Sequence, residues 1–330
     1  MITNTCKVMI LGGNSFSGSW TIRSLAELGH EIFVINRSDE ISKCYRPYLN
    51  SPGIKVLTLG SNYSPKDVAE ICSDNNIECL INFAAQSMVS ESWQSPWDWY
   101  ETNVVWLSRL SHEIIRWGKL KRWIQFTTPE VYGSNSDWIK ESQIFDPSTP
   151  YANSRAAGDW HLYLEFKRSL LPVIFTRTAN VYGPFQQRYR LVPNSLISAA
   201  TQNSMNLHGG GKSRRSFIFV TDVTNALIRI MNMGHVGETY HISTKSMYEI
   251  RHVASLAFEL YGLEPNKFLE TVEDRPGKDH SYMLNSQKIR EELGWSDSTS
   301  LLDGMTATKN WVDLWLETLL QQPSSYLHLS

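Results

Sequence analysis

The segment TPYANSRAAGDWH (149–161) places Tyr151 four residues before Arg155. Side chains four apart lie on the same side of a helix, so a helical segment would make the phenol and the guanidinium neighbours. A phenol accepts a proton only when its pKa falls well below about 10, and a nearby cation lowers that pKa. Arginine holds its charge but cannot release a proton at working pH. The pair therefore predicts a tyrosine base supported by a cation that relays no proton.

A second polar group, Thr128, Glu130 and Tyr132, follows an apolar run in FTTPEVYG (126–133). If that run is a strand of a parallel sheet, the group lies at the carboxyl end, where open α/β sheets bind ligands. We expect Glu130 to act as an acid or base and Thr128 to hydrogen-bond a reacting hydroxyl. An exposed strand-end carboxylate and simple strand-end packing are the respective alternatives. Tyr132 is expected to pack.

A glycine-rich turn, GGNSFSGSW (12–20), follows the apolar run KVMIL (7–11). Gly12 and Gly18 stand six residues apart at the start of a predicted helix, where backbone N–H groups can approach a pyrophosphate. Ser15 occupies the position where a middle glycine is expected. A merely tight turn is the alternative, but the strand before it and the helix after it favour a nucleotide site.

The end of the second apolar run, EIFVIN (31–36), bears on the choice of cofactor. It continues as Asn36, Arg37 and Ser38, without the acid that would bind a ribose 2′-hydroxyl. Arg37 and the Ser38 hydroxyl could bind a 2′-phosphate instead. We therefore expect NADP, with NAD as the alternative, although Arg37 could also be a solvated loop residue.

Short apolar runs alternate with amphipathic stretches in the first half of the chain, which predicts βαβ units and a parallel sheet. After residue 184 the pattern changes to loops, short strands and shorter helices. We predict an α/β fold with a Rossmann-like doubly wound parallel sheet and a smaller C-terminal substrate-binding domain. The domains are expected at 1–184 and 185–330, interleaved near 170–245. Strands are expected at 7–11, 31–36, 54–59, 78–85, 121–128 and 173–183, and helices at 20–29, 65–75 and 96–118.

The bulk composition excludes several classes of function. The chain has 330 residues, 42% hydrophobic, with a net charge of −2, so it gives no electrostatic argument for a nucleic-acid or membrane partner. No apolar run approaches the ~20 residues that span a bilayer, and the start shows no signal peptide. The cysteines lack metal-ligand spacing, so we expect reduced cytoplasmic thiols and no metal site. They are Cys6, Cys44, Cys72 and Cys79.

Together these motifs resemble the extended short-chain dehydrogenase/reductase family, which acts on nucleotide-activated sugars. The likeness covers nearly the whole chain. The segment EDRPGKDHSYMLNSQKIREELGW (273–295) is especially similar to the C-terminal region of sugar-nucleotide 4,6-dehydratases. Four further motifs stand in the family's order: NFAAQSMVSESWQSP (82–96), TNV (102–104), NVYGP (180–184) and GGGKSRRSFIFVTDV (209–223).

The resemblance implies a dehydratase that removes hydride from C4 of an NDP-hexose, eliminates water across C5–C6 and returns the hydride to C6. Arg155 stands where the family usually has lysine, and would donate to the nicotinamide ribose. Pro129–Glu130 stands where many dehydratases have Asp-Glu. Because Pro129 can neither donate nor accept a proton, Glu130 would take H5 and then protonate the C6 oxygen, alone or through a water. Similar GDP-mannose dehydratases also keep the glutamate after a non-acidic residue, whereas sugar 4-epimerases generally lack it.

The binding residues follow from the same motifs. Arg215 and Arg275 are the candidates for the diphosphate, because guanidinium groups suit phosphate oxygens. Asn180 could equally stabilise a turn, and Arg188 and Arg190 could be solvated. The expected cofactor-binding residues are Gly12, Asn14, Ser15, Phe16, Gly18, Asn36, Arg37, Ser38, Ala84, Ala85, Gln86, Thr127, Tyr151 and Arg155. The expected substrate-binding residues are Ser87, Asn180, Arg188, Leu191, Val192, Arg215 and Arg275.

Other functions remain open. Pro129 and Arg155 depart from the common dehydratase pattern, which keeps an epimerase, a 4-dehydrogenase or a decarboxylating enzyme as alternatives. Ser15 and Asn36 depart as well, so a cofactor-binding protein with decayed catalysis is a third hypothesis. The resemblance further implies a role in polysaccharide biosynthesis or glycosylation. It also implies a homodimer, joined through a four-helix bundle from segments 97–117 and 153–169.

Overall fold

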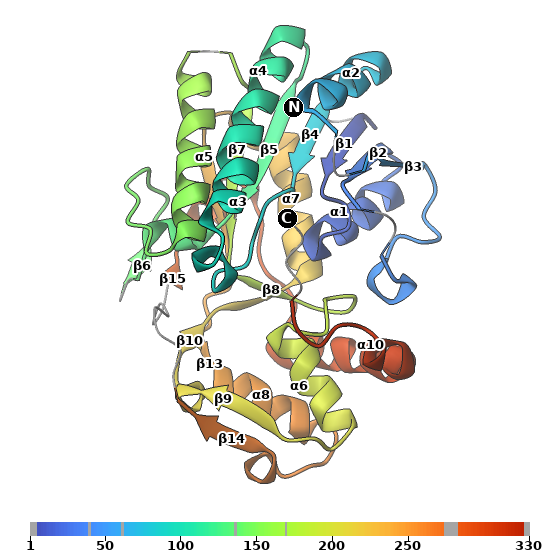
Figure 1. Cartoon of the computed structure of the whole chain (residues 1–330), viewed down its shortest axis with the longest axis vertical. Coiled ribbons are helices and arrows are strands. Elements are labelled where there is room, and N and C mark those ends of the chain that lie inside the picture. Colours follow the sequence, from blue (N-terminus) through green and yellow to red (C-terminus); the bar gives the residue numbers. More distant parts are fainter. Residues whose placement is uncertain are drawn as a thin grey trace.

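The computed structural model describes residues 5–38, 41–60, 63–134, 137–168, 170–273 and 283–326. Within these residues, seven parallel strands form one sheet in the order β3-β2-β1-β4-β5-β7-β12 (Figure 1). This is the predicted Rossmann-like sheet. The strands are β1 (Lys7–Leu11), β2 (Glu31–Asn36), β3 (Ile54–Thr58), β4 (Cys79–Asn82), β5 (Arg122–Thr127), β7 (Val173–Thr178) and β12 (Thr239–Ile242).

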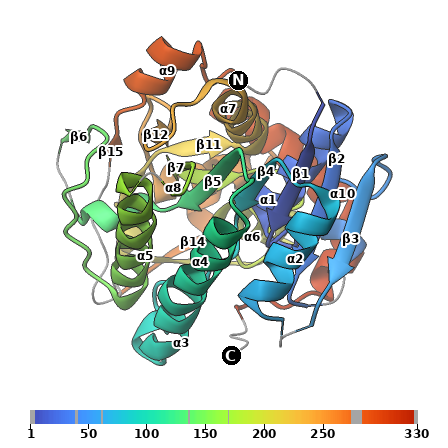
Figure 2. The ribbon, with the colours of Figure 1, turned by 90° about the horizontal axis from the view of Figure 1, so that it is seen from above.

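The sheet is buried on both faces, which is why its strands are nearly continuous apolar runs. Along β1, Val8 and Ile10 belong to one apolar cluster, and Met9 and Leu11 to the other. Helices α1 (Phe16–Glu27) and α7 (Val220–Met233) contribute to the first cluster. Figure 2 shows the helices of the second cluster along the opposite side. They are α2 (Pro65–Asn75), α4 (Leu107–Trp117) and α5 (Pro150–Lys167).

Two predicted elements are interrupted. The expected helix at 96–118 consists of α3 (Pro96–Tyr100), a π-helical turn at Glu101–Trp106 and α4. The expected strand at 173–183 divides into β7 and β8 (Asn180–Tyr182), and β8 leaves the main sheet to pair with β11 (Phe217–Phe219). Both breaks lie beside the cavities described below.

A smaller part lies beyond the carboxyl end of the sheet, below it in Figure 1. Its helices share a third apolar cluster, to which Leu196, Val253 and Val312 contribute. The elements β12, α7 and α9 (Gln287–Leu293) follow residue 184 in the chain but pack with the main sheet. The predicted division into two interleaved domains at residue 184 therefore stays a proposal. The elements of the smaller part are α6 (Leu191–Ala200), α8 (Ile250–Glu259), α10 (Leu301–Leu320), β9 (Met205–His208), β10 (Arg214–Arg215), β13 (Tyr248–Glu249) and β14 (Leu269–Val272).

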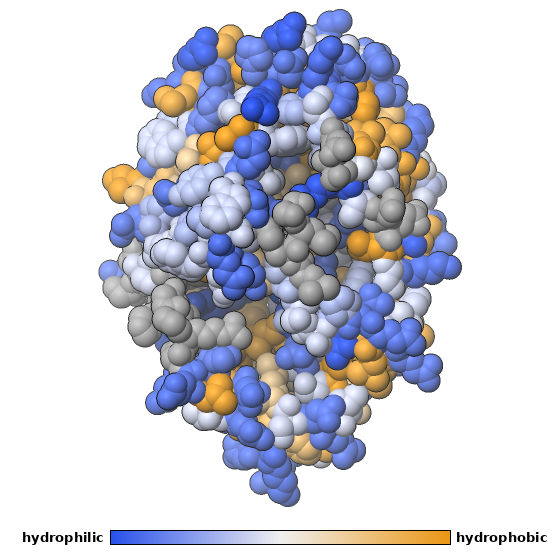
Figure 3. Space-filling model, in the orientation of Figure 1, coloured by the Kyte–Doolittle hydropathy of each residue, from blue (hydrophilic) through white to orange (hydrophobic). Residues whose placement is uncertain are grey.

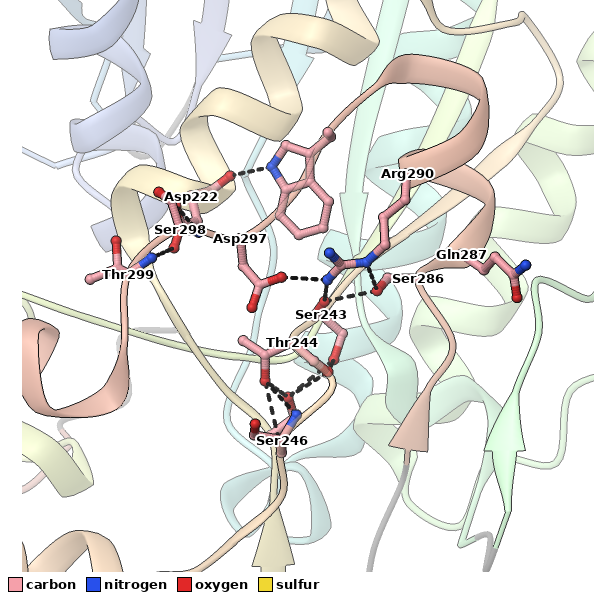
Figure 4. A network of polar contacts seen from close by, with 12 residues as sticks. Asp222, Ser243, Thr244, Ser246, Ser286, Gln287, Arg290, Asp297, Ser298 and Thr299 are labelled. Carbon is pink, nitrogen blue, oxygen red and sulfur yellow. Dashed lines mark hydrogen bonds and ion pairs between the residues drawn. The ribbon is translucent and has the colours of Figure 1, made fainter.

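A polar network fixes the chain that leads into α10 (Figure 4). Asp222, in the first turn of α7, accepts hydrogen bonds from the Ser298 backbone and hydroxyl (3.1 and 2.8 Å) and from the Thr299 backbone (3.1 Å). A carboxylate is favourable at this end of a helix. Arg290 pairs with Asp297 beside it. The network therefore sets where α10 begins relative to the main sheet.

Hydrophilic side chains cover most of the face seen in Figure 3, as expected when the apolar clusters are internal. Among the described residues, no helix is both long and apolar enough to cross a membrane. The described part of the chain also holds no cluster of three or more histidine, cysteine or carboxylate side chains arranged for a metal ion. The four cysteines are buried free thiols.

Candidate active site

Two neighbouring cavities lie at the carboxyl end of the sheet. The larger has a volume of about 590 Å³ and the smaller about 510 Å³. Both are lined by Ser15, Phe83 and Ala85, so they meet along the glycine-rich turn. Together they make a continuous site that runs from the end of β2 to the start of α5.

The turn has the geometry of a phosphate cradle. Gly12 has φ +77°, and a Cβ there would lie 2.8 Å from the Ala84 nitrogen, so only glycine fits. Ser15 is the N-cap of α1: its hydroxyl donates to the Gly12 carbonyl (2.7 Å) and accepts from the Gly18 nitrogen (3.2 Å). Its extended backbone (φ −71°, ψ 155°) needs no glycine. The serine therefore caps the helix, and the residues present fit a dinucleotide.

Asn36 ties this turn to β2. Its Oδ1 accepts from the Asn14 nitrogen (2.9 Å), and Asn14 Nδ2 donates to the Ser38 carbonyl (3.4 Å). Arg37 and Ser38 are exposed and line the smaller cavity. The residue that replaces the usual acid thus positions the loop, and the two residues after it face the site.

A buried amide, Asn103, holds the loop after β4. Its Oδ1 accepts from the Gln86 nitrogen, and its Nδ2 donates to the Gln86 carbonyl and to the Ser154 hydroxyl on α5, all at 3.0 Å. Asn103 lies in the π-helical turn, and a Cβ on Gly158 would meet its carbonyl at 2.4 Å. Asn103 is a site-building residue that we did not predict, although the TNV motif contains it.

The structure brings the four predicted catalytic residues to one wall of the larger cavity. Tyr151 lies in the first turn of α5, which Thr149 caps by accepting from Ala152 (3.1 Å). The Thr128 hydroxyl hydrogen-bonds Tyr151 and also accepts from the Glu130 nitrogen (3.2 Å). The Arg155 guanidinium, buried one turn after Tyr151, donates to the Phe126 carbonyl on β5.

Burial of Tyr151 works against the expected effect of the cation on its pKa. Burial raises the pKa of the phenol above its ordinary value, and the charge of Arg155 lowers it only in part. Glu130 raises this pKa further, while the Thr128 hydrogen bond lowers it. The cation alone therefore does not bring the pKa well below 10, because desolvation outweighs it.

A buried ion pair lies behind this wall. Asp159 accepts from the Thr127 hydroxyl (2.9 Å) and from Arg177 Nη2 (3.0 Å), and the side chains of the pair are at most 2% exposed. Burial raises the pKa of Asp159, and the charges of Arg177 and Arg155 oppose this rise. The pair thus places a carboxylate near the guanidinium that supports Tyr151.

The predicted cofactor residues line one or both of the two cavities, apart from Gly18. A Cβ on Gly18 would lie 2.6 Å from the Gly12 carbonyl, so this glycine permits helix packing. In the described residues it lines neither cavity. Those lining the smaller cavity are Gly12, Asn14, Ser15, Asn36, Arg37, Ser38, Ala84, Ala85 and Gln86. Those lining the larger are Ser15, Phe16, Ala85, Thr127, Tyr151 and Arg155.

Arg188 is the clear correction among the predicted substrate residues. Its Nη1 donates to the carbonyls of Leu319, Leu320 and Gln322 (3.1, 2.8 and 3.0 Å). Carbonyls at a helix C-terminus lack partners within the helix and attract a cation. Within the described part of the chain, Arg188 lines neither cavity, and Arg275 lies outside the described residues. The other predicted substrate residues line the larger cavity: Ser87, Asn180, Leu191, Val192 and Arg215.

Several lining residues were not predicted. Tyr63 and Trp106 line the smaller cavity, and Gln187 and Tyr189 the larger, where Arg190 also lies. The sequence around an aromatic residue does not show whether its side chain packs in the core or faces a ligand. No local pattern could have separated the two cases.

Comparison with known proteins gives a consistent result. A family model described as GDP-mannose 4,6 dehydratase matches residues 9–308. A dTDP-D-glucose 4,6-dehydratase of Mus musculus is 30% identical over 319 residues, which cover 92% of this chain and 88% of the relative. A trifunctional UDP-glucose 4,6-dehydratase/UDP-4-keto-6-deoxy-D-glucose 3,5-epimerase/UDP-4-keto-L-rhamnose-reductase of Arabidopsis thaliana is also 30% identical, over 92% of this chain. The chain spans less than half of that relative's length, 46%.

Solved structures show the same relationship. A dTDP-glucose 4,6-dehydratase from Streptomyces venezuelae, with NAD bound, superposes with a TM-score of 0.85 at 26% identity. The match covers 95% of this chain and 99% of that one. A UDP-glucose 4-epimerase from Thermotoga maritima, with UDP-glucose, has a TM-score of 0.83 at 26% identity, over 94% of this chain and 99% of that one.

Proposed function

The chain belongs to the GDP-mannose 4,6 dehydratase family, and from that premise we propose that it is an NAD(P)-dependent nucleotide-sugar 4,6-dehydratase. Its product is an NDP-4-keto-6-deoxy-hexose. One observation carries the proposal: Tyr151, Thr128 and Glu130 line a single cavity that adjoins a phosphate cradle. An acid–base residue for C5–C6 elimination thus stands beside the base for C4 oxidation.

In the first step Tyr151 Oη receives the proton of the C4 hydroxyl. Thr128 hydrogen-bonds this oxygen, and the buried charge of Arg155 stabilises the phenolate. A bound nicotinamide cofactor would supply the hydride acceptor for C4 and return the hydride to C6. Because burial raises the pKa of Tyr151, Arg155 serves as the fixed charge that offsets desolvation.

The second step removes water. A ketone at C4 acidifies H5, which the Glu130 carboxylate takes, and the same carboxyl group then protonates the departing C6 hydroxyl. Pro129 has no exchangeable proton, so one glutamate carries both transfers. After the hydride reaches C6, C5 takes a proton from solvent, and the sum of the steps is the loss of one water.

The diphosphate and the sugar bind in the larger cavity. Arg215 and Arg190 line it, and guanidinium groups pair well with phosphate oxygens. Asn180 and Ser87 supply uncharged polar groups on the same lining. The substrate class is therefore an NDP-hexose.

Arg37 and Ser38 at the smaller cavity favour NADP over NAD. Against this, the similar dehydratase from Streptomyces venezuelae was solved with NAD. We keep NADP as the favoured cofactor and NAD as the alternative. Equilibrium binding of each nucleotide to the purified protein decides between them.

The proposal is tested by incubating the protein with a panel of NDP-hexoses, with NAD and NADP supplied separately. The masses of the products are then measured by mass spectrometry. A product lighter by one water is expected. A 4-epimerase is the second candidate, because an epimerase with UDP-glucose has the same fold at 26% identity. It would give a product of unchanged mass, and a 4-dehydrogenase would give one lighter by two hydrogens.

The working unit is a homodimer joined by α3, α4 and α5 of each subunit. These helices lie side by side in Figures 1 and 2. They carry exposed apolar side chains, among them Trp97 (66%), Leu164 (56%) and Trp160 (40%). An exposed apolar group of this kind marks an interface. The free thiols fit a cytoplasmic enzyme, and the family resemblance supports a role in polysaccharide biosynthesis or glycosylation.

A further inference from the structure

The segment that follows α10, residues 321–326, turns back from the smaller part toward the main sheet (Figure 1). Pro323, Ser324 and Ser325 are exposed, whereas Tyr326 is half-buried. Other residues therefore partly cover the Tyr326 side chain, although the three residues before it are exposed. The residues that Tyr326 contacts line the two cavities, whereas Tyr326 itself lines neither.

Tyr326 contacts one wall residue of each cavity. Its ring lies edge-on to Tyr189, with 6.0 Å between centroids, and Tyr189 lines the larger cavity. Its hydroxyl donates to Gln86 Oε1 over a long 3.5 Å, and Gln86 lines the smaller cavity. The side chain therefore bridges a lining residue of the larger cavity and one of the smaller cavity.

The surroundings keep the Tyr326 hydroxyl a neutral donor. Burial raises the pKa of this phenol, as do Tyr189 and Glu91, while Arg37 and Arg190 lower it. Arg37 lines the smaller cavity and Arg190 the larger. Because its one donated hydrogen bond, to Gln86, is long, this hydroxyl can exchange that partner for a phosphate or ribose oxygen of a bound nucleotide.

The same dipeptide holds the segment at both ends. Arg188 binds the carbonyls of Leu319, Leu320 and Gln322 at its root, and Tyr189 packs against Tyr326 at its tip. The arginine that was expected to bind substrate thus anchors the segment that carries Tyr326.

We propose that Tyr326 is a further cofactor-binding residue, laid across the dinucleotide by the C-terminal segment so that the cofactor leaves only when the segment lifts. The inference rests on the proposed function. A dehydratase returns its hydride to the molecule from which it came, so turnover needs no exchange of cofactor. Slow release of the cofactor therefore does not lower the turnover rate.

The test measures release of NAD, not activity. Full-length protein is loaded with radiolabelled NAD, chased with excess unlabelled NAD, and sampled over time for retained label; NADP is run in parallel. Tyr326→Ala should release nucleotide about tenfold faster, because ring contact and hydrogen bond are both lost and such losses act mainly on the dissociation rate. Tyr326→Phe should release it about twofold faster, since only a weak hydrogen bond is lost.

Ser324→Ala is the matched control, an exposed position in the same segment, and should behave as wild type. Equal release rates for wild type and Tyr326→Ala would overturn the inference and leave the dehydratase proposal standing. A wild-type protein that binds neither NAD nor NADP would overturn both. Faster release from Arg188→Met as well, with an unchanged unfolding temperature, would support the anchoring at the root.

Discussion

Tyr151 is a buried phenol whose neighbours decide when it can accept a proton. Burial raises its pKa, and Arg155, one helical turn away, works against that rise. The spacing of this pair, and the position of Thr128 and Glu130 after an apolar run, were enough to predict that the four residues meet. The balance between desolvation and charge was not predictable, because it depends on how deeply the folded protein buries the phenol.

Arg155→Met should raise the pKa of Tyr151 further, because the neighbouring charge that lowers it is lost. The base acts when deprotonated, so the rise of kcat/KM with pH should move to higher pH. At pH 7 we expect kcat/KM to fall, by about tenfold for each unit by which the pKa rises. Arg155→Lys, which keeps a charge, is the matched control. Superimposable pH profiles for Arg155→Met and wild type would contradict this role.

At the scale of elements, α5 is fixed to β7 by the ion pair between Asp159 and Arg177. Strands 7–11 and 31–36 were predicted with the observed bounds, since apolar runs of strand length read clearly. The π-helical turn at Glu101–Trp106 was not, because its Asn103 bonds to residues distant in sequence. Such long-range packing leaves no periodic signal.

Asp159→Asn should lower the free energy of unfolding by about 3–5 kcal/mol, because Arg177 would remain as a buried charge without its counter-ion. Urea denaturation measures this loss. The exposed pair Lys66–Glu70 supplies the comparison: Glu70→Gln should cost about 0.5 kcal/mol or less. Similar losses of unfolding free energy for Asp159→Asn and Glu70→Gln would mean that the buried pair contributes no more to stability than the exposed pair.

At the scale of the whole molecule, the site is assembled from both parts of the chain. The doubly wound sheet was predicted from alternating apolar and amphipathic segments. The placement of Tyr326 against Gln86 was not, since nothing in the local sequence marks a C-terminal segment that returns to the main sheet. The same limit explains why Arg188 was assigned to the substrate.

Light scattering should give a mass about twice that of the 37.8 kDa chain. Leu164→Asp, on the exposed face of α5, should shift the protein toward the monomer mass, because a charge would enter an apolar interface. Leu302→Asp, similarly exposed but on α10, should leave the dimer intact. A wild-type mass near that of one chain would refute the dimer.

Elimination across C5–C6, with Glu130 as the acid–base group, is tested most directly by determining where deuterium enters the product in D2O. The proposed mechanism predicts a product lighter by one water with one deuterium at C5, while C6 carries the hydrogen that began at C4. Glu130→Gln should make no such product. Loss of only two hydrogens, or an unchanged mass with the C4 configuration inverted, would contradict the dehydratase.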